Sequence, residues 1–174
     1  MDKEQDRTYE NYPLGIVFVS DLLSLAIYGI GAYVMFRLGA GWAAAYLLYV
    51  VLLEYMVLKK SCVNCCYYGK TCAFGRGRLC SLLFRRGDAH RFVSREVTWK
   101  DIAPDFLVSL IPVIVAAYLM MTQGFDWLLL ALLLSMLLLG FAGNALVRGR
   151  LACKFCRQRI IGCPAEQLFN KSKK

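Results

Sequence analysis

Cys62-Val-Asn-Cys65 is followed after six residues by Cys72, and Cys153-Lys-Phe-Cys156 is followed after six residues by Cys163. The two C-x2-C-x6-C strings lie 91 positions apart, and each comes directly after a long apolar segment. Identical spacing in the same setting indicates one structural unit that the chain uses twice.

The apolar segments around these strings predict an all-α membrane protein. Hydrophobic residues make up 59% of the chain, more than a soluble domain of 174 residues would bury. The four apolar stretches run over 13–36, 42–58, 102–122 and 127–147. Each is close to the roughly 20 residues with which a helix crosses about 30 Å of hydrocarbon.

The repeat extends beyond the cysteines, because Pro13 opens the first stretch and Pro104, 91 residues later, opens the third. We therefore expect four transmembrane helices arranged as two tandem two-helix repeats. Since each repeat has an even number of spans, both have the same orientation, and their pseudo-two-fold axis runs along the membrane normal. This symmetry would bring the two cysteine units together on one face.

Basic residues predict the orientation. The segment 59–100 holds ten Lys or Arg and the tail from 148 holds eight, whereas the turns 37–41 and 122–126 hold only Arg37. Under the positive-inside rule, both termini and the long loop are cytoplasmic in a multi-pass plasma-membrane protein. The net charge of +9 is then mostly this bias, with anionic lipid headgroups as natural partners and no need for nucleic acid. The acidic start and the lack of a cleavage site indicate that the first span is retained.

This interpretation divides the chain into five parts. They are a cytoplasmic N-terminal segment (1–12), a first helix pair (13–58), a cytoplasmic cysteine-rich basic loop (59–101), a second helix pair (102–147) and a cytoplasmic cysteine-rich basic tail (148–174).

Cytoplasmic thiols are kept reduced, so a dense C-x2-C framework there indicates a metal-binding domain more than a disulfide-bonded one. The chain has 8 cysteines, which is two sets of four thiolates. The predicted first site is Cys62, Cys65, Cys72 and Cys80, and the predicted second site is Cys66, Cys153, Cys156 and Cys163. Cys66 is assigned to the second site because its neighbour Cys65 serves the first. Two alternatives stay open for the second site: completion by His90, or an open coordination position.

Zinc at two sites is the expected cofactor, because four-thiolate sites are typical of structural zinc. Two iron–sulfur clusters are the alternative. The run from Cys153 through Cys163 to Pro164 is similar in outline to the cluster-binding run of bacterial ferredoxins, with Arg159 where that run has a third cysteine. In the first copy, Tyr68 stands at that place and Ala73 replaces the proline.

Two groups of polar residues outside the cysteines are further site candidates. Asp21, Glu54, Asp105 and Asn144 lie four to eight residues from the cytoplasmic ends of their spans and form one layer, where carboxylates cost about 2.5–3.5 kcal/mol each to insert. This layer predicts a polar pocket for a headgroup, an ion or a proton. Arg85, Arg86, Arg91 and Arg95 are the candidates for contact with headgroups or a protein partner.

Three functions follow from these features. The favoured one is a non-enzymatic accessory or adaptor subunit, whose cysteine-ligated domain docks a protein partner or a larger membrane complex. The alternatives are a membrane-anchored iron–sulfur electron carrier and a lipid-modifying enzyme that uses the acidic layer. An enzyme is less favoured, because the sequence has no nucleophile and base pair at a recognisable spacing.

Overall fold

The chain folds almost entirely into helices, as a computed structural model shows for residues 8–95 and 98–164. Four helical stretches are long and apolar enough to cross a membrane. They run over Leu14–Leu38, Ala40–Asn64, Lys100–Gln123 and Trp127–Phe155. The prediction of an all-helical chain with four candidate membrane spans is confirmed, whereas the side of the membrane on which each end lies stays a prediction.

Several shorter elements accompany the spans. The order is α2 (Leu14–Leu38), α3 (Ala40–Lys60), η1 (Cys62–Asn64), α4 (Arg76–Leu83), α5 (Ala89–Val93), α6 (Trp99–Gln123), α7 (Trp127–Leu137), η2 (Leu138–Gly143), α8 (Asn144–Leu146), η3 (Val147–Ala152), η4 (Cys153–Phe155) and α9 (Arg157–Gly162). The elements η1 and η4 are 3₁₀ turns, and η2 and η3 are π-helical. Residues 1–7 of the predicted N-terminal segment and residues 165–174 of the predicted tail lie outside the described residues.

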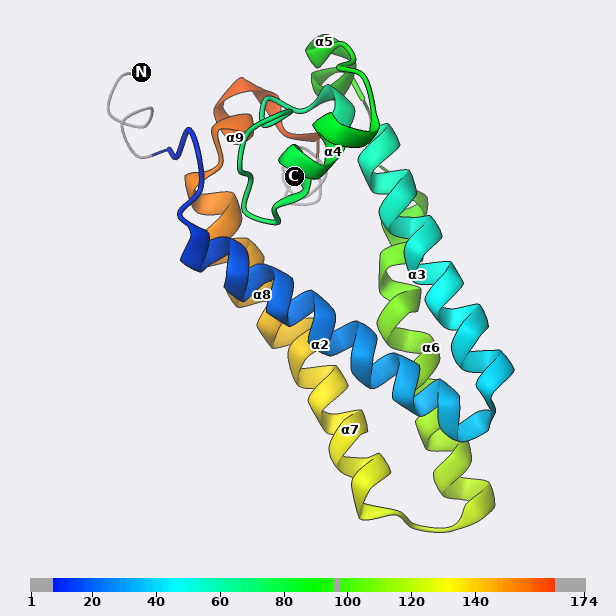
Figure 1. The fold of residues 1–174 in the computed structure, drawn as a ribbon. Coiled ribbons are helices and arrows are strands. Elements are labelled where there is room, and N and C mark those ends of the chain that lie inside the picture. The colour runs from blue at the N-terminus through cyan, green and yellow to red at the C-terminus, as the bar shows by residue number, and fades with distance from the viewer. Residues whose placement is uncertain (1–7, 96–97, 165–174) are drawn as a thin grey trace.

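The spans form two antiparallel hairpins whose short turns meet at the end opposite the cysteines (Figure 1). Gly39 makes the first turn with φ 150°, and its N–H donates to the carbonyls of Met35 and Phe36. A non-glycine residue would be strained there. Arg37, beside this turn, forms an ion pair of 3.1 Å with Asp126 at the start of α7. The pair joins the two hairpins at this end.

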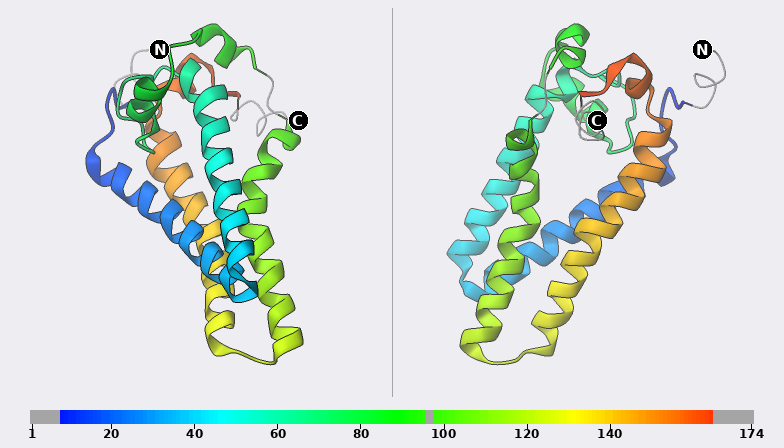
Figure 2. Two further views of the ribbon diagram at one scale, coloured as in Figure 1. Left: turned by 45° about the vertical axis from the view of Figure 1, so that its right-hand side comes forward. Right: turned by 180° about the vertical axis from the view of Figure 1, so that it is seen from behind.

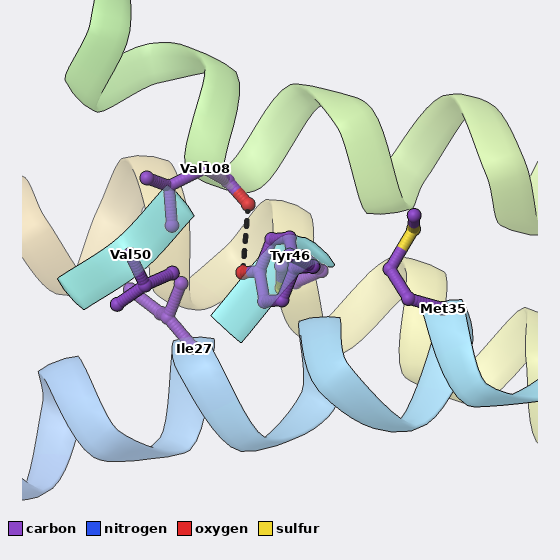
Figure 3. Packing of buried hydrophobic residues seen from close by; sticks show 6 residues of the cluster. Ile27, Met35, Tyr46, Val50 and Val108 are labelled. Carbon is purple, nitrogen blue, oxygen red and sulfur yellow. Dashed lines mark hydrogen bonds between the residues drawn. The ribbon is translucent and has the colours of Figure 1, made fainter. Parts of the chain in front are cut away.

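The centre of the bundle is an apolar cluster in which one tyrosine hydroxyl supplies a hydrogen bond that a proline removes from α6. Pro112 lies inside α6, so the carbonyl of Val108, four residues earlier, has no N–H partner in its own helix. The Tyr46 hydroxyl of α3 donates to this carbonyl at 3.0 Å (Figure 3). Gly31 of α2 makes room for the ring, because a Cβ there would lie 2.2 Å from the Tyr46 hydroxyl oxygen. A proline, a tyrosine and a glycine on three helices thus form one packing unit.

The last span changes from α to π geometry at Leu138 and again at Val147. A π segment holds an extra residue per turn and often accompanies a functional site. Within it, Gly143 packs against Leu23 of α2, and Gly140 packs against Ser109 of α6. These close approaches position Asn144 between α2 and α6.

The two cysteine units form a small cap over one end of the bundle, which residues 8–13 also join (Figures 1 and 2). Towards this end α2 and the last span diverge from α3 and α6, and the cap lies over the ends of the helices.

Candidate functional site

The two C-x2-C strings adopt the same backbone structure. In η1 the N–H of Cys65 donates to the carbonyl of Cys62 at 3.2 Å, and in η4 the N–H of Cys156 donates to the carbonyl of Cys153 at 3.2 Å. The next bond also repeats, since Tyr68 and Arg159 donate to the carbonyls of Cys65 and Cys156, each at 3.1 Å. The sequence repeat is thus a repeat of local structure over these residues.

The two units are joined by a pair of equivalent hydrogen bonds. The N–H of Cys66 donates to Oε1 of Gln158 at 3.0 Å, and the N–H of Arg157 donates to the Tyr67 hydroxyl oxygen at 3.0 Å. Residues 66 and 67 correspond to 157 and 158 after a shift of 91 positions. Each unit therefore donates an N–H from the same repeat position to the same side-chain position of the other unit. Both accepting side chains are buried, Tyr67 at 3% exposed and Gln158 at 4%.

Backbone N–H groups also point at the second cysteine of each string. Cys65 accepts from the N–H of Tyr67, and Cys156 accepts from the N–H groups of Gln158 and Arg159. The pKa of Cys65 falls, because the Cys66 thiol and then these N–H groups donate to its sulfur. Burial raises the pKa of Cys156 to about 11, and its N–H donors oppose this rise. Donors of this kind stabilise a thiolate once a metal or a proton acceptor draws the proton away.

The thiols of the first unit lie near one another. Cys62 is close enough to Cys72, Cys80 and Cys65 to interact with them electrostatically, and Cys80 is likewise close to Cys65 and Cys72. The Cys80 side chain is 0% exposed, and its thiol donates to the carbonyl of Leu58 at the end of α3. The four residues predicted for the first site therefore lie in one region of the cap, with Cys80 contributed by α4.

Cysteines of the second predicted site are gathered less completely. Cys66 lies beside Cys156, and Cys153 lies near Cys156. Cys163 follows α9, where Gly162 packs so closely on Val93 of α5 that a Cβ would lie 2.7 Å away. Helix α5 also carries the exposed His90, the alternative fourth ligand. Across the described residues, no three His, Cys, Asp or Glu side chains are close enough together to hold a metal ion.

The N-terminal residues that precede α2 form hydrogen bonds with both cysteine units, which the sequence did not predict. Tyr9 donates its N–H to the carbonyl of Phe155, and its carbonyl accepts from the Tyr67 hydroxyl at 2.6 Å. Tyr12 donates its N–H to the carbonyl of Thr71 and its hydroxyl to the carbonyl of Ala152. The signal available in the sequence was three tyrosines, Tyr9, Tyr12 and Tyr67, next to otherwise polar or cysteine-rich segments.

Below the cap, all four spans line a cavity of about 60 Å³. Of the predicted polar layer, Glu54, Asp105 and Asn144 line this cavity. Asp21 does not line it but lies beside Gly75, the residue before α4. Hydroxyl groups of Ser24, Tyr28 and Ser109 complete the polar lining, together with two arginines.

The first of these arginines, Arg76, comes from the cap. It opens α4 and reaches into the bundle, where its guanidinium forms an ion pair with Glu54. Glu54 also accepts a hydrogen bond of 2.6 Å from the Tyr28 hydroxyl. Arg76 stands four residues after Cys72 and four before Cys80. The predicted first metal site and the cavity thus share one short segment, a link that spacing along the chain did not show.

The second arginine, Arg148, extends from the end of the last span. It donates to Oδ1 of Asn144 at 3.2 Å, and its guanidinium lies 5.4 Å from the ring centre of Phe74. Arg76 lies against the same ring at 5.6 Å. Both guanidiniums therefore lie within cation–π distance of the same ring.

The predicted headgroup or partner contacts are mostly exposed. Arg85, Arg86 and Arg91 are exposed around α4 and α5. Arg95 instead forms an ion pair of 3.2 Å with Asp101 in the first turn of α6, where Asp101 also completes a capping box with Thr98. Arg95 therefore positions the start of the third span.

Comparison with known protein families, curated proteins and solved structures gives no match to this chain.

Proposed function

We propose that this protein is a membrane-anchored metal-binding adaptor, in which the cap holds two cysteine-ligated zinc ions and docks a protein partner at the membrane surface. The observation that supports it most is the paired C-x2-C turn, with N–H donors directed at Cys65 and Cys156. Such donors compensate the charge of thiolate ligands, as the outer hydrogen bonds of metal sites do.

The grouping of the thiols supports the proposed division into two sites. Cys62 lies near Cys72, Cys80 and Cys65 of the same loop, and Cys80 lies near Cys65 and Cys72. The Cys66 thiol donates to Cys65 and also lies near Cys156 of the other unit, with the positive charge of Arg157 beside it. A metal at each site would draw these side chains to about 2.3 Å, the usual zinc–sulfur distance. Binding would then add its free energy to the folding of the cap.

The adaptor role rests on the exposed surface of the cap. Helix α4 buries Cys80 and exposes Leu79, Leu82 and Leu83, with Leu82 82% exposed. Arg85 and Arg86 follow this apolar edge. An apolar edge with flanking arginines is suited to an acidic, partly apolar protein surface.

Metal analysis of the purified protein tests the cofactor. The protein is purified in detergent without added metal, and zinc and iron are measured together with the visible spectrum. The proposal expects about two zinc ions per chain and no colour. Two iron–sulfur clusters with visible absorption would overturn it in favour of the electron carrier.

Single Cys→Ser variants test the division. Cys163→Ser and Cys66→Ser should each remove about one zinc ion and leave the first site filled, and Cys80→Ser should remove the other ion. Ser81→Ala, next to Cys80 and exposed, is the matched control and should keep both. Loss of both ions in every variant would indicate one shared centre. Retention of both ions in Cys66→Ser would make His90 or an open position the next candidate.

The docking surface is tested separately. Replacing Arg85, Arg86 and Arg91 by Ser should abolish co-purification of the partner while both zinc ions are retained. Equal replacement of Lys59 and Lys60, which are exposed at the end of α3, is the control. Undiminished co-purification with the arginine variant would exclude this surface.

A further inference from the structure

Two opposite charges, Asp105 and Arg148, line the cavity near each other without a direct ion pair between them in the described part of the chain. Glu54 and Arg76 form a direct ion pair. Asp105 of α6 and Arg148 of the last span line the same space, yet no direct ion pair joins them within the described part of the chain. One carboxylate and one guanidinium are thus left to interact with whatever enters the cavity.

The groups that Arg148 contacts directly carry no negative charge. It contacts the Asn144 amide oxygen and the Phe74 ring, neither of which is anionic. Asp105 is exposed on the surface of a helix that is apolar enough to cross a membrane. Charged groups at such positions are costly, so they are usually paired or belong to a site.

We propose that this cavity binds the headgroup of phosphatidylethanolamine, with the ammonium at Asp105 and the phosphate at Arg148. The headgroup carries one positive and one negative group, which matches the unpaired charges. A cavity of about 60 Å³ holds roughly two water-sized groups, which suits the ammonium and its adjacent carbon. The phosphate and the acyl chains stay outside, at the exposed Arg148 and along the apolar spans. This site is additional to the proposed metal centres and does not depend on them.

The lining also predicts selectivity among lipids. A primary ammonium has three N–H donors, for which the Asp105 carboxylate and the hydroxyl oxygens of Ser24 and Ser109 are acceptors. The trimethylammonium of phosphatidylcholine has no donor and is larger. Phosphatidylglycerol has a phosphate for Arg148 but no cation for Asp105. The site should therefore prefer the ethanolamine lipid to both.

Lipid competition on the unmodified, full-length protein tests this preference. The protein is placed in nanodiscs with equal amounts of the three lipids, released, and the retained lipids are identified by native mass spectrometry. We expect the ethanolamine lipid to be retained about tenfold over the choline lipid, as for the loss of one charged hydrogen bond. Equal retention of the two, or preference for phosphatidylglycerol, would overturn the proposal. Displacement by soluble phosphoethanolamine as readily as by the lipid would overturn the lipid as its source.

Variants test the residues. Asp105→Asn should lower this preference about tenfold. Arg148→Gln should instead lower the retention of all three lipids, because each carries the phosphate that Arg148 would bind. Arg150→Gln is the matched control, because Arg150 is exposed two residues further on and does not line the cavity. Helix content and zinc content show whether each variant folds, which separates this proposal from the metal proposal. An unchanged preference in folded Asp105→Asn would overturn the assignment.

Discussion

The backbone N–H of Cys66 lies 3.0 Å from Oε1 of Gln158, which is buried in the opposite cysteine unit. A second bond at the equivalent repeat positions joins the Arg157 N–H to the Tyr67 hydroxyl oxygen at the same distance. These two bonds join segments about 90 residues apart, and each involves a side chain rather than two backbones. The stability of the cap therefore depends on residue types that are not cysteines.

Gln158→Ala should loosen the cap, because it leaves the Cys66 N–H without its acceptor at a cost of about 1–3 kcal/mol. Gln158→Glu keeps an acceptor oxygen for Cys66 but places a buried carboxylate opposite the Gly162 carbonyl, so it should not restore the stability of the unmodified chain. Protease cleavage within 148–164 is the measurement. Gln123→Ala, exposed at the end of α6, is the control. Equal cleavage of Gln158→Ala and the unmodified chain would show that the reciprocal bonds contribute little.

Gly31→Ala should destabilise the bundle, because its methyl group would overlap the Tyr46 ring and displace the hydroxyl from Val108. Overpacking of this kind typically costs about 1–3 kcal/mol. Gly29→Ala is a matched control on the same helix, where a Cβ meets nothing within 4 Å. Unfolding in mixed micelles should show a lower midpoint for Gly31→Ala alone. Equal midpoints for the two variants would contradict the packing of Gly31 on Tyr46.

Arg76→Ala should destabilise the junction between cap and bundle, because Glu54 then keeps only the Tyr28 hydroxyl. The side chains of the pair are 21% and 29% exposed. The cost should therefore lie between the ~0.5 kcal/mol of a surface pair and the ~3–5 kcal/mol of a buried one. Arg78→Ala, exposed on the same helix, should change stability by less than about 0.5 kcal/mol. Arg76→Ala/Glu54→Gln should recover part of the loss in the same unfolding measurement, and no recovery would refute the coupling.

A thiol reagent that does not cross membranes should leave all 8 cysteines unlabelled in intact cells, because the positive-inside rule predicts that both cysteine units lie on the cytoplasmic side. A cysteine introduced at the opposite end, as Gln123→Cys, should be labelled and serves as the positive control. Labelling of native cysteines but not of Gln123→Cys would reverse the orientation.

The sequence by itself determined the four apolar spans. Span length and apolar content follow from the thickness of hydrocarbon. Almost every backbone group in a span is satisfied within its own helix, the Val108 carbonyl being an exception, so the spans depend little on distant residues. The polar layer was also visible, because charges within apolar stretches are conspicuous, and three of its four members line one cavity.

Only the tertiary structure decided which groups meet. In the sequence, Arg76 is one of ten basic residues over 59–100 and has no distinguishing feature. In the structure, its side chain enters the bundle and forms an ion pair with Glu54. Tyr9 and Tyr12 precede the first span, yet they fasten both cysteine units. These contacts depend on side chains that approach across helices and loops far apart in the chain. Which side chains meet depends on the angles and positions at which the helices cross. The hydrophobic pattern and the residue spacing do not specify these angles and positions.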